Sequence, residues 1–307
     1  MARSLLNMPP ELLVQILAFL PVQALLKFSQ TSQYSHSLAK SSLHTLALGI
    51  HTTRVSSAPP HEDDPYNVSV VIPDAQAFDY LTLLSFHTAL TTNILFRHGS
   101  TLRNLHLSLW TLTEPTSRAL ASLSALRVLS IRIEAFPHLR AVPHSRFAQQ
   151  RVEQHKAWSL LASTAAWAPR LHALRIDGAE LNTRQLTTLL RPSRWCRELW
   201  ISNCAMVGPE LWTFLASEWE ARSALQVLGV MNCGGQLDEH VLDLIGALDG
   251  LQFLSLRGCY GLDSDAVEKR NNEAWHIPEC ILSLPRVVNE SGSMLIEVDP
   301  AYLEADD

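Results

Sequence analysis

The chain has 307 residues, of which 47% are hydrophobic and 18% are charged, a composition typical of a folded protein with one large or two modest domains. The net charge is −6, and residues 1–60 contain four basic residues against one acidic residue, so the negative charge lies in the rest of the chain. The sequence shows no basic stripe and no run of about 18 apolar residues. We therefore expect neither nucleic-acid binding nor a membrane span.

The first predicted element is a helix of about three turns that begins near Pro9 and ends before Pro21. Pro9 and Pro10 fit the first turn, where a backbone N–H has no partner within the helix. The carboxylate of Glu11 in that turn faces the positive end of the helix dipole. The apolar residues of this helix form one broad face, which consists of Leu12, Leu13, Ile16, Leu17 and Leu20.

Two shorter helices are expected next, one that begins with Leu25, Leu26 and Phe28 and one that ends at Leu38. Three helices in about 40 residues bury too little surface to be stable alone. The apolar face must therefore be completed by the following domain, by a partner chain, or by both.

The order of these residues resembles the F-box, a motif of about 40 residues found in the substrate receptors of ubiquitin ligases. The resemblance runs from Met8 to Ala39, and Met8 stands where the family usually has leucine, a mild change because the two side chains have similar volumes. The resemblance implies docking to a Skp-type adaptor and, through it, to a cullin. The implied adaptor-binding residues are Met8, Pro9, Pro10, Leu12, Leu13, Ile16, Leu17, Leu20, Pro21, Leu25 and Leu26.

The segment after these helices is less regular. Residues 43–48 have the pattern L-x-x-L-x-L, and residues 51–67 are rich in Ser, Thr, Pro and acidic residues, which indicates a surface loop. A short strand is expected at residues 68–72. Asp74 is expected to cap a helix that continues through Leu90.

A repeat then begins, with apolar residues in the order L-x-x-L-x-L. The units start at Leu102, Leu126, Leu171, Cys196, Leu225 and Leu251. All intervals but one lie in or near the range of leucine-rich repeats, and the long interval between residues 126 and 171 indicates an insertion with a helix over residues 147–167. Further helices are expected after Asn182 or Thr183, at Pro209, after Asp238 and at Asp263 or Ser264.

The fourth and sixth residues of each unit should point inward, because side chains alternate along a strand. Cys204, Cys233 and Cys259 follow three residues later in three successive units, which favours buried packing over a zinc site. These units resemble the cysteine-containing leucine-rich repeats that often accompany an F-box in proteins of a kind common in fungi. Cys196 replaces a leading leucine, and the odd number of cysteines favours reduced thiols and a cytoplasmic or nuclear location.

We therefore predict an α/β fold with four parts. These are a three-helix F-box (residues 1–42), an irregular first repeat with a loop and a linking helix (43–100), a curved leucine-rich-repeat solenoid with parallel strands on its concave face (101–268), and a C-terminal cap or acidic tail (269–307). Residues 294–298 are a candidate final strand. The last part ends in a segment, residues 297–307, that contains five acidic residues and no basic residue.

The sequence contains no phosphate-binding loop, nucleophile elbow or zinc-protease motif, and its histidines lack ligand spacing, so we expect no enzyme activity, metal or cofactor. The expected function is substrate recognition for a Skp–cullin–F-box ubiquitin ligase, with an unknown protein substrate bound on the repeats. The alternative is a non-catalytic scaffold whose F-box-like helices only cap the solenoid.

A substrate-binding patch is expected on the concave face, where most residues are polar. It consists of Trp200, Met231 and Phe253, with Arg175 and Arg257 at its edges. Gly229 beside Trp200 is expected to leave room for a ligand group. A second interpretation is that the acidic C-terminal segment covers this patch.

Overall fold

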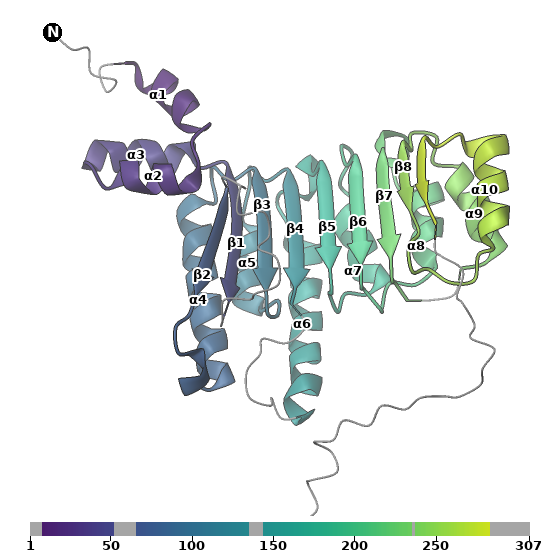
Figure 1. Ribbon diagram of the computed structural model, residues 1–307, viewed down its shortest axis with the longest axis horizontal. Helices are drawn as coiled ribbons and strands as arrows, with labels where there is room; N and C mark the ends of the chain where they lie inside the picture. The colour runs from purple at the N-terminus through teal and green to yellow at the C-terminus, as the bar shows by residue number, and fades with distance from the viewer. Residues whose placement is uncertain (1–7, 52–65, 135–143, 235–236, 283–307) are drawn as a thin grey trace, which may run out of the picture.

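The computed structural model describes residues 8–51, 66–134, 144–234 and 237–282. Three N-terminal helices lie at one end of a parallel sheet, and the remaining helices cover one face of that sheet (Figure 1). The sheet has nine strands in the order β2-β1-β3-β4-β5-β6-β7-β8-β9, and every neighbouring pair is parallel. The prediction of an α/β fold, with three helices followed by leucine-rich repeats, is confirmed.

The strands are β1 (Thr45–His51), β2 (Asn67–Val71), β3 (Asn104–Leu109), β4 (Val128–Ile133), β5 (Ala173–Asp177), β6 (Glu198–Ser202), β7 (Val227–Met231), β8 (Phe253–Ser255) and β9 (Glu279–Ile281). The helices are α1 (Pro10–Leu17), α2 (Val22–Ser29), α3 (Gln33–Ser42), α4 (Tyr80–His98), α5 (Glu114–Ala121), α6 (His144–Thr164), α7 (Thr183–Leu190), α8 (Glu210–Thr213), α9 (Glu239–Gly246) and α10 (Ser264–Arg270). Among the described helices, none is both long and apolar enough to cross a lipid bilayer.

The core of the array comes from the inward positions of the repeats. Leu105, Leu129, Leu174, Leu199, Leu228 and Leu254 are in register on successive strands, and all are fully buried. The leading residue of each unit is also buried, including Cys196. The opposite side chains of the same strands face away from the helices, and we call this side of the sheet the open face. Because helices are wider than the strand spacing, stacked repeats place the sheet on the inner side of the array.

The turn after each strand explains a further pattern of the repeat. Gly178, Asn203, Asn232 and Gly258 occupy equivalent positions and have φ values of 48–73°. Glycine and asparagine are the residues that adopt this left-handed conformation most readily. Asn232 Nδ2 donates to Asn203 Oδ1 at 3.1 Å, and Asn203 Nδ2 donates to Asp177 Oδ1 at 2.6 Å, so these turns are joined by side-chain hydrogen bonds.

Several predicted elements differ from the structure. Asp74 does not cap α4, because it has φ of 50° and precedes a short 3-10 helix, whereas the Asp79 carboxylate accepts hydrogen bonds from the backbone N–H groups of Leu81 and Thr82. The first helix ends at Leu17, one turn before Pro21. The strand expected at residues 68–72 is present as β2, and it pairs with β1 at the edge of the sheet.

The C-terminal end of the array extends beyond residue 268. The strand β9 pairs with β8, so Ile277 and Cys280 take the first and fourth positions of one more unit. The leucine pattern did not indicate this unit because cysteine replaces its fourth-position leucine. The candidate strand at residues 294–298 and the acidic segment lie outside the described residues.

Candidate functional site

The F-box helices have two apolar sides. Leu13, Leu17, Val22 and Leu25 are at most 5% exposed and form the inner side, together with Leu38. On the outer side, apolar side chains remain in solvent, and they are Leu12 (45% exposed), Ile16 (41%), Phe19 (83%) and Leu26 (53%). Leu12 and Ile16 are one helical turn apart on α1, so their exposed side chains are neighbours, and an exposed apolar patch often marks a binding site.

The residues expected to bind an adaptor are divided between these sides. Leu12, Ile16 and Leu26 are exposed, as are Pro9, Pro10 and Pro21; Met8 and Leu20 are partly buried. Leu13, Leu17 and Leu25 are buried within the chain and stabilise the helices instead of presenting a surface. Phe19 was not among the expected residues, although it is the most exposed large apolar side chain in the part of the chain that the structure describes. Phe19 lies in the turn after α1, and a helix that continued through residue 19 would have placed it on the same face as Leu12 and Ile16.

The F-box helices are joined to the repeats by packing as well as by the chain. The buried residues of α1 to α3 belong to the same hydrophobic cluster as the repeat core, and Leu43 continues this cluster between α3 and β1. His44 Nδ1 also lies 2.9 Å from the carbonyl oxygen of Thr101 in the next unit. The inner side of the F-box is therefore continuous with the hydrophobic core of the repeats.

The open face carries an aromatic pair that spans three strands. Trp200 on β6 and Phe253 on β8 have ring centroids 5.4 Å apart, although the strand β7 lies between them. The contact is possible because Gly229 on β7 is opposite Trp200 and has no side chain. A Cβ atom on Gly229 would lie 2.3 Å from Cε3 of the indole. The expected space for a ligand group beside Gly229 is therefore filled by Trp200, and that prediction is wrong.

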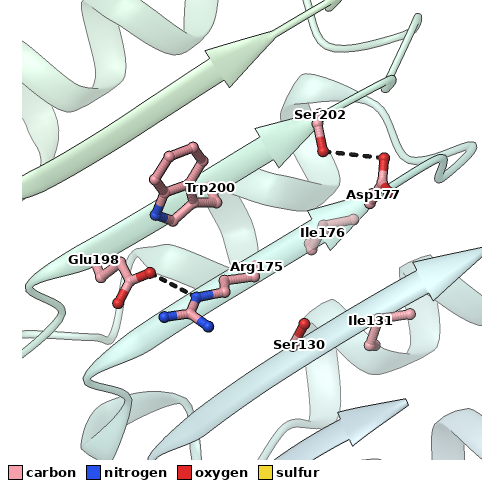
Figure 2. A pocket seen from close by; sticks show the side chains of 8 residues that line it. All are labelled: Ser130, Ile131, Arg175, Ile176, Asp177, Glu198, Trp200 and Ser202. Carbon is pink, nitrogen blue, oxygen red and sulfur yellow. Dashed lines mark hydrogen bonds and ion pairs between the residues drawn. The ribbon is translucent and has the colours of Figure 1, made fainter. Parts of the chain in front are cut away.

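A hollow of about 370 Å³ lies beside Trp200 (Figure 2). Its lining includes Arg175, Asp177, Glu198, Trp200 and Ser202, which come from β5 and β6. Arg175 Nε donates to Glu198 Oε1 at 2.6 Å, and the Ser202 hydroxyl donates to Asp177 Oδ1 at 3.0 Å. The lining of the hollow thus contains one guanidinium group, two carboxylates and the indole ring of Trp200.

The other two expected patch residues lie at different places. Met231 is partly buried and is in register with Ser202, whereas Arg257 is exposed and follows β8. The structure therefore brings Trp200 and Phe253 into direct contact and places Arg175 beside Trp200 on the neighbouring strand.

The cysteines have the environment of core residues. No disulfide joins them, and burial raises the pKa of Cys196 and Cys204 to about 12 and that of Cys233 to about 11. Such thiols are poor nucleophiles at neutral pH. Cys196, Cys204 and Cys259 are buried as expected, but Cys233 is only partly buried, so that part of the prediction is wrong.

A polar cluster lies near the other end of the open face. The Ser108 hydroxyl donates to Glu134 Oε1, and His51 Nδ1 lies 3.6 Å from the same oxygen. The hydrogen bond to Glu134 raises the pKa of His51. Burial acts to raise the pKa of Glu134, but hydrogen bonds from His51 and Ser108 outweigh it and lower that pKa. The carboxylate lies between the hydroxyl and the imidazole, which is the wrong order for histidine to activate the serine.

The N-terminal helices match a known domain family: residues 5–45 match the F-box domain. No match is found among curated proteins. Among solved structures, the chain is similar to an internalin from Listeria monocytogenes, with 13% identity and a TM-score of 0.27 over 90% of this chain and 98% of the internalin chain. The chain therefore carries an F-box domain followed by leucine-rich repeats, which the register and burial of β3 to β8 define. F-box domains generally bind Skp-type adaptors, and both kinds of domain are typically non-catalytic.

Proposed function

We propose that this protein is the substrate-recognition subunit of a Skp–cullin–F-box ubiquitin ligase. The observation that carries the proposal is the outer apolar side of the F-box, which is exposed although the inner side is packed into the core of the array. Burying Leu12, Ile16 and Leu26 against an adaptor would remove their side chains from water, a favourable change of about 25 cal/mol per Å². Phe19, which is 83% exposed in the turn after α1, is a further candidate contact for the adaptor.

The repeats would hold a protein substrate on the open face, with Trp200, Phe253 and Met231 as apolar contacts and Arg175 and Arg257 as charged contacts. Aromatic and arginine side chains are those that interfaces use most often as anchors. The protein would supply no chemical group of its own. It would raise the effective concentration of the substrate near a ubiquitin-charged enzyme, in the cytoplasm or the nucleus.

Co-purification of the adaptor tests the first part of the proposal. The Leu12→Asp and Ile16→Asp variants should each lose the adaptor while they remain folded, because both side chains are exposed. Val152→Asp is the matched control, since Val152 is 55% exposed on the distant helix α6. Equal recovery of the adaptor with the wild type and with all three variants would refute adaptor binding through this surface.

The continuous core favours one alternative, in which the helices only cap the array. Buried Leu38 and Leu43 contribute to this cap whether or not an adaptor binds. A folded protein that recovers no adaptor from a lysate containing it would support the cap. A proteome-wide comparison of ubiquitination with and without the protein then tests the ligase role and gives candidate substrates.

A further inference from the structure

A row of basic residues runs along one rim of the sheet, where the fold brings together residues that are far apart in the sequence. The residue after the leading apolar residue is basic in four successive units, as Arg103, Arg127, His172 and Arg197. Their backbones are direct neighbours: the N–H groups of residues 127, 172 and 197 donate to the carbonyl oxygens of residues 103, 127 and 172 at 2.7, 2.7 and 2.8 Å. We call these four residues the basic rim.

The three arginines of the basic rim are exposed and lack acidic partners. Among the described residues, no carboxylate lies within ion-pair distance of Arg103, Arg127 or Arg197. Of the other described arginines, seven form ion pairs and five do not, but only the rim arginines follow one another on neighbouring units. Like charges on neighbouring strands repel one another. The net charge of −6 belongs to the chain as a whole, whereas the basic rim is a local positive surface that an anionic partner would neutralise.

The spacing of the row indicates the shape of that partner. Strands lie about 4.8 Å apart, so the row from β3 to β6 spans about 14 Å. In an extended chain with a rise of about 3.3 Å per residue, residues i and i+4 are about 13 Å apart, and the side chains of i, i+2 and i+4 point the same way. An extended segment with an acidic group at alternate positions therefore matches the length of the basic rim.

We propose that the basic rim binds an acidic segment of a partner protein, with carboxylate or phosphate groups at alternate residues. The rim lies at the starts of the strands, on the side where the F-box helices join the array (Figure 1). This surface is distinct from the outer side of the F-box and from the aromatic pair on the open face, and its role does not depend on either. Three arginines on a span of about 14 Å favour a short peptide over a nucleic acid, whose affinity comes from many phosphate contacts.

Fluorescence anisotropy with the full chain tests the proposal. The probes are labelled peptides Gly-Glu-Ser-Glu-Ser-Glu-Gly, its version with phosphoserine at both serines, its version with Gln for Glu, and a twelve-residue oligothymidylate. We expect the acidic and phosphorylated peptides to bind and the Gln peptide not to bind. The Arg127→Gln/Arg197→Gln variant should bind the acidic peptides at least tenfold more weakly, and higher salt should weaken binding to the wild type.

The matched control is Arg97→Gln/Arg184→Gln, which removes two exposed charges from the helices α4 and α7 and should change affinity less than twofold. Equal losses in the two double variants, or equal binding of the Glu and Gln peptides, would overturn the proposal. Tighter rim-dependent binding of oligothymidylate would assign the rim to nucleic acid instead. If the peptides bind only after the five acidic residues of segment 297–307 are changed to the corresponding amides, we would conclude that the basic rim binds the chain's own C-terminal segment.

Discussion

The close approach between Trp200 and Gly229 gives a quantitative test of the open face. An alanine Cβ at position 229 would lie 2.3 Å from the indole, against ordinary contacts of 3.4–4 Å, so the indole must move by about 1 Å or more. The backbone of Gly229 has no positive φ, so alanine causes no backbone strain there. The whole cost of Gly229→Ala should therefore come from the displaced ring and its contact with Phe253.

This cost can be worked from two contributions. Overpacking of this kind typically costs about 1–3 kcal/mol, and the aromatic pair with Phe253 contributes about 0.5–1.5 kcal/mol that a displaced indole would lose in part. In a Trp200→Ala background the overlap is absent, and Gly229→Ala should be neutral or stabilise by about 0.4–1 kcal/mol through the unfolded chain. We expect a coupling free energy of at least about 1 kcal/mol between the two positions.

Urea unfolding of the wild type, both single variants and the double variant measures this coupling. Differences between the urea midpoints report differences in stability if the slope of the unfolding free energy against urea concentration is the same for the four proteins. If Gly229→Ala lowers the free energy of unfolding equally in both backgrounds, the indole does not lie over Gly229 and the described aromatic pair is wrong.

The remaining predictions concern burial and charge. The side chain of Leu13 is 0% exposed, so Leu13→Ala should lower the free energy of unfolding by about 2–5 kcal/mol in a denaturation experiment. Substitutions at the surface usually change this free energy by less than about 0.5 kcal/mol, so a loss that small would contradict the burial of Leu13. The His51–Glu134 pair should stabilise the fold while His51 is protonated and Glu134 is ionised. Because the pKa of His51 is raised, this stabilisation is lost as the pH rises through that pKa. Because the pKa of Glu134 is lowered, the stabilisation is also lost in acid, as the pH falls through the pKa of Glu134. Melting temperatures from pH 5.5 to 8.5 should therefore converge for the wild type and Glu134→Gln at the alkaline end, and a constant difference would contradict the pair. Maleimide labelling at pH 7, followed by mass spectrometry, should modify partly buried Cys280 well before Cys196, and the reverse order would contradict the burial of Cys196.

Local periodicity was sufficient to predict most of the array. The inward leucines recur at a fixed interval, and each unit repeats the same choice of buried positions, so one unit predicts the others. The caps Asn182, Asp238 and Asp263 follow from side-chain chemistry, and in the structure each accepts a hydrogen bond from the start of its helix. The prediction at Asp74 failed because a second aspartate, Asp79, lies five residues later and both can start a helix.

Features that depend on contacts between units were harder to predict. Whether space beside Gly229 stays open depends on the rotamer of Trp200, and the register alone does not fix that rotamer. The division of the first helix into a buried and an exposed side depends on where α3 packs. The basic rim could have been found in the sequence by aligning the second residue of every unit, since Arg103, Arg127 and Arg197 fall at that position.

The central claim is that the outer side of the F-box is a docking surface, and a calorimetric titration with a purified Skp-type adaptor tests it most directly. We predict saturable binding with one adaptor per chain, weakened at least a hundredfold by Ile16→Asp and unchanged by Val152→Asp, with identical melting temperatures for the two variants. Absence of binding to the folded wild type, or equal affinities for both variants, would contradict the claim.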